Sequence, residues 1–188
     1  ENLQLTGAYK IRGALNKIRS LSDEDKAKGV VCSSAGNHAQ GVAFAASQAN
    51  VKSTIVMPKT TPLLKIQSTK DLGGNVVLSG YVYDDAFNEA KRIEQEQGAL
   101  FIHPFNDIDV ICGQGTVALE IFEDLKDVDV ILCPIGGGGL ISGVTLAAKA
   151  LNPNVKVIGV QAEGANAMVK SFKAGEIIAL DSVDTIAD

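Results

Sequence analysis

The sequence predicts an α/β protein made of two lobes, each an open parallel sheet with helices on both faces. Short β-branched runs alternate with longer segments of helical period along the chain. Apolar residues make up 46% of the 188 residues, which suffices for packed cores and is too much for a disordered chain. We expect strands at 30–32, 53–57, 75–78, 100–103, 128–133 and 155–161.

Helices are expected between these strands, because apolar residues there recur every three or four positions. The predicted helices are 11–21, 40–49, 62–72, 83–97, 116–125, 140–151 and 166–174. Ser22 precedes three acidic residues and is a predicted N-cap, since the helix dipole favours acids in a first turn. A boundary is predicted at 103–112, where Pro, Asn and two Asp interrupt the pattern. We therefore expect a small domain, 24–106, and a large domain formed by 1–23 and 107–188.

The charge balance argues against nucleic acid as a partner. Lys and Arg number 17 against 22 Asp and Glu, a net charge of −5, whereas nucleic-acid binders need a positive surface. Residues 130–148 carry no charge and are almost long enough to cross a membrane. Pro134 and four successive glycines forbid one continuous helix there, so no membrane partner is expected.

Cysteine and histidine usage indicates a reducing compartment and no metal. The thiols Cys32, Cys112 and Cys133 are odd in number and lie in apolar runs, so we expect buried free thiols in a cytoplasmic protein. With two histidines and no CxxC pair, no zinc site can be assembled. The sequence thus predicts no metal.

A run of four glycines, Gly136, Gly137, Gly138 and Gly139, lies between an apolar strand and an amphipathic helix that starts near Leu140. Backbone N–H groups that converge at a helix N-terminus bind phosphate, and a flexible linker would lie among polar residues. No Lys-Ser or Lys-Thr follows, which excludes a Walker loop. An alternative phosphate site is the GxGxxA pattern at 113–118, typical of dinucleotide-binding folds.

A second candidate turn follows the strand at 30–32 and contains Ser34, Ala35, Gly36, Asn37 and His38. It offers a hydroxyl, an amide, an imidazole and backbone N–H groups before a helix, a combination suited to a carboxylate. The alternative is that Ser34 or Asn37 only caps the helix. His38 is either a base or a structural hydrogen-bonding group.

Lys10 follows the aromatic Tyr9 among apolar neighbours. Desolvation would lower the pKa of its amine and leave a neutral nucleophile able to form a Schiff base, although most lysines near a helix start are solvated. A reactive amine, a carboxylate-binding turn and a phosphate cradle together are what a pyridoxal phosphate enzyme acting on an amino acid requires.

The residues resemble the fold-type II pyridoxal phosphate enzymes, specifically the threonine ammonia-lyases (threonine dehydratases) with the related serine dehydratases and serine racemases. The matching segments are ENLQLTGAYKIRGALNKI, SSAGNHAQGVAFAA, PKTTPLLKIQSTKDLGG and CPIGGGGLISG. The resemblance implies that Lys10 bonds covalently to pyridoxal 5'-phosphate, Tyr9 packs beside its ring and Asn37 bonds its ring hydroxyl. It further implies that Ser34 to His38 hold the substrate carboxylate and that Gly136 to Leu140 bind the cofactor phosphate.

The implied reaction is deamination of L-threonine to 2-oxobutanoate and ammonia, and of L-serine to pyruvate and ammonia. Racemases resemble Ser-Ser-Gly-Asn-His, and Ala35 stands where they have the second hydroxyl, which favours elimination. Serine racemase activity is one alternative. Alternatives of another class are a dinucleotide-binding oxidoreductase built on 113–118 and an inactive binding fragment. Threonine against serine, and a biosynthetic against a catabolic role, stay open.

The resemblance also implies partners and missing parts. Relatives form homodimers or homotetramers, and Thr6-Gly7 resembles part of a surface that binds a nucleotide effector. Glu163 and Ala167 resemble two points of a metal site in the racemase branch, but Val169 occupies its carboxylate position, and we expect no metal. Because the segment that meets the pyridine nitrogen is absent, we expect a fragment truncated at both ends.

Overall fold

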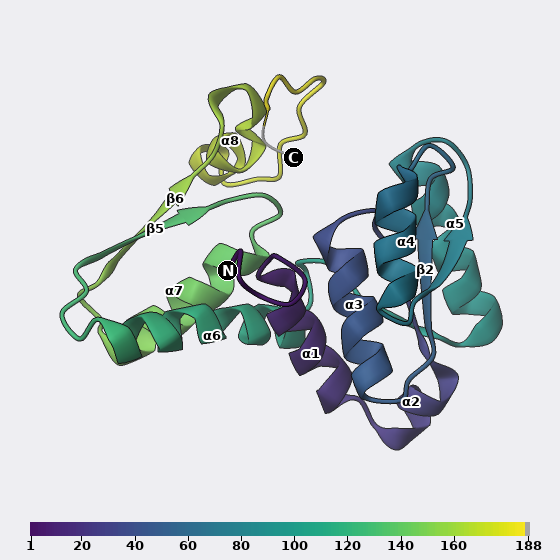
Figure 1. Cartoon of the computed structure of the whole chain (residues 1–188). Helices are drawn as coiled ribbons and strands as arrows, with labels where there is room; N and C mark the ends of the chain where they lie inside the picture. The colour runs from purple at the N-terminus through teal and green to yellow at the C-terminus, as the bar shows by residue number, and fades with distance from the viewer. Residues whose placement is uncertain (187–188) are drawn as a thin grey trace. The chain divides into compact units, whose positions relative to one another are not determined.

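The computed structural model describes residues 1–186, which fall into two compact units, Glu1–Gln114 and Gly115–Asp188. Each unit contains its own parallel sheet. Figure 1 labels the elements along the chain.

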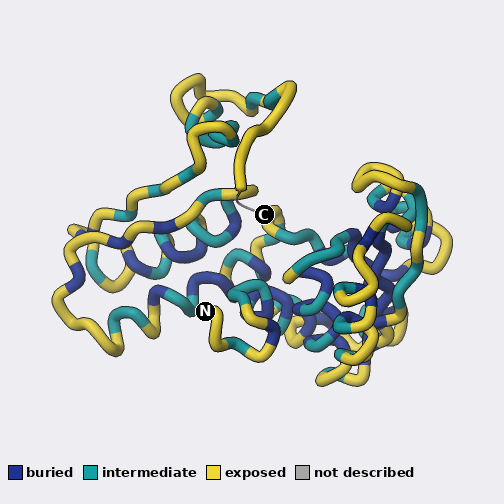
Figure 2. The backbone as a smooth tube through the Cα atoms, turned by 45° about the horizontal axis from the view of Figure 1, so that its top comes forward, coloured by how far each residue is buried: buried dark blue, intermediate teal, exposed yellow. Residues whose placement is uncertain are grey.

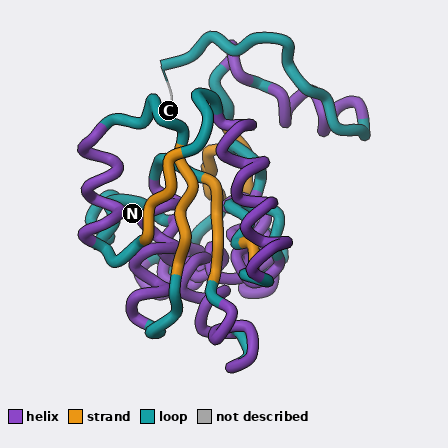
Figure 3. The backbone as a smooth tube through the Cα atoms, turned by 90° about the vertical axis from the view of Figure 1, so that its right-hand side faces the viewer, coloured by secondary structure: helices purple, strands orange, loops and turns teal. Residues whose placement is uncertain are grey.

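The first unit is a four-stranded parallel sheet with the strand order β3-β2-β1-β4. Figure 3 shows strands of this sheet running side by side with helices around them. The elements are α1 (Lys10–Ser20), α2 (Asp23–Lys28), β1 (Val30–Ser33), α3 (Asn37–Gln48), β2 (Ser53–Met57), α4 (Leu63–Asp71), β3 (Asn75–Leu78), α5 (Tyr83–Gln97) and β4 (Leu100–Phe101).

Both central strands, β1 and β2, are buried along their whole length because helices cover both faces of the sheet. Alternate side chains point to opposite faces. Cys32 and Ile55 belong to the cluster packed on α1 and α3, whereas Val31 and Val56 pack on α5. Figure 2 shows this buried centre in dark blue.

The second unit is a two-stranded parallel sheet covered on one face. It contains β5 (Val130–Pro134), α7 (Gly139–Leu151), β6 (Lys156–Val160), η1 (Glu163–Ala165) and α8 (Ala167–Ala174), together with the second half of α6 (Ile108–Asp124). Ile131 and Val144 lie in a core with residues of α6. On the opposite face Leu132 and Val160 are 67% and 49% exposed. One face of this sheet therefore presents apolar side chains to solvent.

The predicted α/β architecture of parallel sheets and helices is confirmed, with the elements in the expected order. Helices cover both faces of the first sheet as expected, but one face of the second sheet is exposed. The strands 53–57 and 75–78 and the helix 83–97 have the predicted bounds, and Ser22 caps α2 by accepting the Asp25 N–H at 3.1 Å. The strand expected at 100–103 ends at Phe101. The division into domains 24–106 and the remainder stays a prediction.

The largest correction concerns α6, which begins at Ile108, eight positions before the expected start. Gly113 and Gly115, read as turn formers, lie inside this helix. Each faces a neighbouring backbone: a Cβ would lie 2.6 Å from the Arg12 oxygen at Gly113, and 3.0 Å from the Gly143 oxygen at Gly115. The glycines serve close helix packing, so no strand-to-helix dinucleotide turn exists at 113–118, and that alternative is wrong.

The thiol prediction is correct for two of the three cysteines. Cys32 and Cys133 are buried, and burial raises the pKa of both thiols. Cys112 is exposed, because its position on α6 turns away from the core that Gly113 and Gln114 face. Between residues 1 and 186, no helix has both the length and the apolar character needed to cross a membrane.

Candidate active site

Lys10 is the first residue of α1, and its side chain turns into the first unit. The amine Nζ donates a hydrogen bond to the carbonyl oxygen of Pro104 at 2.7 Å and lies 5.3 Å from the centre of the Tyr9 ring. Burial lowers the pKa of this amine, because removal from water disfavours its charged form. The hydrogen bond to Pro104 holds the Lys10 amine in place, and the lowered pKa favours its neutral form. A nucleophilic lysine requires both.

The start of α1 is set closely against α3. A Cβ on Gly41 would lie 3.3 Å from the backbone carbon of Lys10 and 3.3 Å from the Ile11 nitrogen. Only a glycine allows the two helices this separation without displacing the Lys10 backbone. Gly41 was not among the predicted site residues; the available signal was a glycine at the second position of the predicted helix 40–49.

The turn 34–38 joins the end of β1 to the start of α3. The Ser34 hydroxyl accepts the Gly36 N–H at 3.2 Å, and Gly36 is the N-cap with no side-chain capping bond. Neither Ser34 nor Asn37 therefore caps the helix through its side chain. The first N–H groups of α3 have no partner within the helix, and the Asn37 side chain is exposed. The turn can offer these donors to an anion.

His38 is a structural side chain. It is 4% exposed, and its Nε2 lies 2.9 Å from the Ile102 carbonyl oxygen. Because a carbonyl only accepts, Nε2 donates. Burial, and the nearby charges of Lys10 and His103, lower the pKa of His38 to about 4, so the imidazole is neutral at pH 7. What His38 can offer to a ligand is its backbone N–H.

His103 and Pro104, which the sequence placed in the predicted boundary 103–112, lie next to the Lys10 amine. The Nδ1 atom of His103 accepts the N–H groups of Phe105 at 3.2 Å and Asn106 at 2.8 Å. These bonds fix the turn that carries the Pro104 carbonyl. The first unit thus brings Lys10, the turn 34–38 and residues 103–104 together.

The glycine turn lies in the second unit, between β5 and α7. Gly138 is the N-cap of α7 with φ 90°, a conformation that favours glycine, and no side chain caps the helix. A Cβ on Gly136 would meet no atom within 4 Å, so space lies beside the turn. Gly139 and Leu140 open the helix, where N–H groups lack partners inside it. Backbone donors at an open helix start fit a phosphate.

The residues present fit pyridoxal 5'-phosphate in two independent ways. The Lys10 amine matches the aldehyde of that cofactor, and the open turn at 136–140 matches its phosphate. Among residues 1–186 no group of three or more His, Cys, Asp or Glu side chains could hold a metal ion. The donor chemistry of the site is that of an amine and backbone N–H groups.

Comparison with known proteins extends this result to the whole chain. The L-threonine ammonia-lyase of Thermotoga maritima is 55% identical over 188 residues, which cover 100% of this chain and 47% of that protein. Threonine deaminase isoform 2 of Solanum lycopersicum superposes over 100% of the chain and 52% of its own length, with a TM-score of 0.97 and 46% identity. Maize serine racemase superposes over 100% of this chain and 57% of its own length, with a TM-score of 0.96 and 46% identity.

The chain spans about half the length of the curated relatives it matches. The family model of the pyridoxal-phosphate dependent enzymes matches residues 1–188. The family match runs over the whole chain, and each of the two structural neighbours also superposes on 100% of it. The chain belongs to the pyridoxal-phosphate dependent enzyme family.

Proposed function

We propose that the chain carries a catalytic site that deaminates L-threonine to 2-oxobutanoate and ammonia, and L-serine to pyruvate and ammonia. The observation that carries this proposal is the Lys10 amine, which burial shifts toward neutrality and the Pro104 carbonyl orients at 2.7 Å. A neutral amine at a fixed position can take a proton from the α-carbon of a bound amino acid. The relatives named for threonine ammonia-lyase and threonine deaminase support the same reaction.

Bound pyridoxal 5'-phosphate would supply an electron-accepting ring that acidifies the α-carbon. The chain's own residues bind and orient. Lys10 would hold the cofactor and move the proton, with Tyr9 beside the ring. Asn37, exposed at the start of α3, would donate to the ring hydroxyl. The N–H groups of Gly136 to Leu140 would bind the phosphate.

The turn 34–38 would bind the substrate carboxylate through backbone N–H groups. Ser34 supports this role because its hydroxyl already accepts the Gly36 N–H and so holds the turn in shape. The helix dipole of α3 favours a negative charge at this end. Ala35, between Ser34 and Gly36, adds no acid or base.

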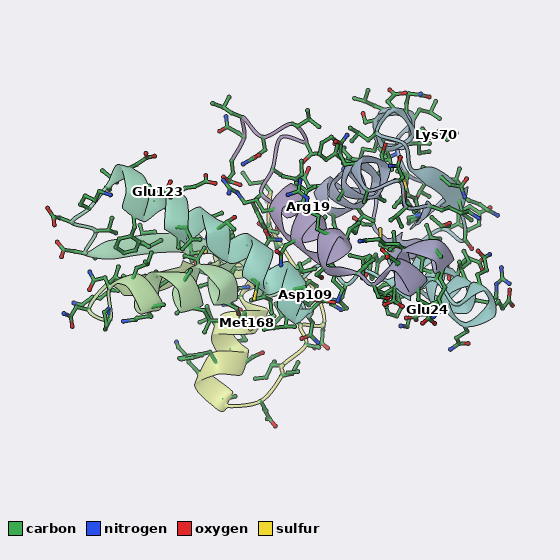
Figure 4. The ribbon with its side chains drawn as sticks, turned by 90° about the horizontal axis from the view of Figure 1, so that it is seen from below. Arg19, Glu24, Lys70, Asp109, Glu123 and Met168 are labelled. Carbon is green, nitrogen blue, oxygen red and sulfur yellow. The ribbon has the colours of Figure 1, made fainter. Side chains whose placement is uncertain are left out.

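Turnover of threonine tests the proposal. With pyridoxal phosphate and L-threonine, we expect 2-oxobutanoate, measured with a coupled dehydrogenase. Lys10→Ala removes the proton-transferring amine and is expected to lower the rate by at least about 100-fold. Lys70→Ala, an exposed lysine on α4 seen in Figure 4, is the matched control and should keep the rate. Equal rates in the two variants would contradict the proposal.

A second candidate is serine racemase activity, favoured by the similarity to the maize enzyme. A racemase needs an acid or base on each face of the α-carbon, and Ala35 supplies neither on the second face. We expect no D-serine from L-serine with the unchanged chain. Ala35→Ser adds a hydroxyl in the turn and is expected to produce D-serine detectable by chiral chromatography. D-serine formation without this substitution would favour the racemase.

Three further properties belong to the same proposal. The cysteines are free thiols, which fits a cytoplasmic location. The chain would form a homodimer or homotetramer, as the resemblance to the threonine ammonia-lyases implies. A nucleotide effector near Thr6-Gly7 is supported by the Thr6 hydroxyl, which is buried and has no hydrogen-bond partner among the described residues. Sedimentation with and without a nucleotide tests both.

A further inference from the structure

Gln114 is a fully buried polar side chain to which the proposed reaction gives no role. It lies on α6 and is 1% exposed. Its Oε1 accepts the backbone N–H of Gly13 at 3.3 Å, and Gly13 lies near the start of α1. The Nε2 atom is buried and has no hydrogen-bond partner among residues 1–186. A buried amide with one unsatisfied nitrogen costs free energy, so an apolar side chain of the same shape would fit this core at lower cost.

The contact is possible because the two helices meet backbone to backbone. A Cβ on Gly13 would lie 2.4 Å from Gln114 Nε2 and 2.7 Å from the Val110 carbonyl oxygen. A Cβ on Gly113 would lie 2.6 Å from the Arg12 oxygen and 2.6 Å from Gly13 Cα. Both glycines are required for this approach. The crossing therefore fixes α1 within tenths of an ångström, three residues from Lys10.

Other contacts also hold the first turn of α1: Arg12 pairs with Glu1 at 2.8 Å, and α3 approaches closely at Gly41, but neither comes from α6. The N-cap of α1, Tyr9, makes no side-chain capping bond, and the Arg12 N–H bonds back to Tyr9 in a tight turn. Gly13 weakens the helix by about 1 kcal/mol relative to alanine. Further along, Lys17 pairs with Asp107 and Asp109 at 3.0 and 2.9 Å, which holds the other end of α1. Figure 4 labels Asp109 at the start of α6.

We propose that Gln114 is a positioning residue for Lys10: its side-chain oxygen fixes the turn of α1 that places the Lys10 amine on the Pro104 carbonyl. Together with the Lys17 pairs, this bond holds α1 at two points along α6. The inference rests on the proposed function only where turnover is the readout. The placement of the amine can be measured without cofactor or substrate.

Gln114→Met is the test variant, because it keeps the length and removes the oxygen. The first readout is the pH midpoint of acetic anhydride labelling of Lys10, measured by mass spectrometry without cofactor. Loss of the fixed, buried position is expected to raise this midpoint by about half a pH unit or more. The second is threonine turnover, where kcat should fall about tenfold while KM changes less than about twofold.

Thr69→Val is the matched control. Thr69 is also 1% exposed, and its hydroxyl donates a part-buried hydrogen bond to the Lys65 carbonyl oxygen at 2.9 Å, but it lies on α4. We expect it to lower stability and to leave the Lys10 midpoint and kcat unchanged. Gln114→Asn, which withdraws the oxygen by one methylene, should shift both readouts in the direction of Gln114→Met. An unchanged midpoint and kcat in a folded Gln114→Met or Gln114→Asn protein would overturn the inference.

A measurement on the unchanged protein covers the case in which neither Gln114 variant folds. The Gly13 amide should be among the slowly exchanging amides in deuterium oxide, because its acceptor is buried. Fast exchange at Gly13 would overturn the inference. A shifted Lys10 midpoint without threonine turnover in any protein would instead contradict the proposed function and leave the positioning role standing.

Discussion

Burial lowers the pKa of two side chains near the candidate site, Lys10 and His38, with different consequences. Lys10 and His38 both lose solvent, and in both cases the charged form is disfavoured, so the pKa falls. For Lys10 the consequence is a more nucleophilic amine. For His38, whose Nε2 donates to the Ile102 carbonyl, it is a neutral imidazole that ties the start of α3 to the end of β4.

His38 makes the stability of the fold depend on pH. Its pKa is about 4 when folded against 6.5 as the reference, so the unfolded chain binds the proton first as the pH falls. Stability contributed by neutral His38 is present above pH 6.5 and is progressively lost toward pH 4, by roughly 3 kcal/mol in total. His38→Gln keeps a donor but does not titrate. Urea unfolding from pH 7 to 4 should show the unchanged chain losing more stability than His38→Gln; parallel curves would contradict this.

At the scale of helices and strands, glycines explain both the successes and the failures of the sequence analysis. Strand and helix periods predicted the alternation correctly, and Gly138 lies, as predicted, in a turn before a helix, where its φ is positive. Gly113 and Gly115 allowed a wrong alternative, a dinucleotide-binding turn, because a packing glycine and a turn glycine look alike in one sequence. The partner that distinguishes them, such as Gly13 opposite Gly113, is about 100 residues away in the chain.

Gly41 gives a test at this scale. In an exposed helix, glycine to alanine stabilises by about 1 kcal/mol. At Gly41 the new Cβ would meet backbone atoms of Lys10 and Ile11 at 3.3 Å, which cannot move aside like a side chain. We expect Gly41→Ala to destabilise by about 1 kcal/mol and Gly41→Val by about 3 kcal/mol in urea unfolding. A more stable Gly41→Ala protein would show that α1 and α3 are not held this closely.

At the scale of the whole molecule, the residues of the proposed site are divided between the two units. Lys10 and the turn 34–38 belong to the first unit, and the glycine turn belongs to the second. The roles of these parts stay predictions, and the motifs that point to them are local: an amine, a loop or a helix start. Such motifs could not predict Pro104, Gly41 or Gln114, which act through contacts between elements far apart in the chain.

The second unit leaves one face of its sheet exposed, and two neighbouring residues test that assignment. Ile131 is 8% exposed and packs in the core, whereas Leu132, on the other face, is 67% exposed. Ile131→Ala should cost about 2–5 kcal/mol and Leu132→Ala less than about 1 kcal/mol. Thermal and urea unfolding of the two variants measure the difference. Equal costs would mean that the Leu132 face is covered.

The most direct test of the central claim is where pyridoxal phosphate becomes attached. After incubation with the cofactor and reduction with borohydride, peptide mass spectrometry should find the phosphopyridoxyl group on Lys10, the half-buried amine with the lowered pKa. Exposed lysines such as Lys70 should carry little of it. Lys10→Ala should lose the label without transferring it elsewhere. A label spread over exposed lysines, with Lys10 unmodified, would contradict the account.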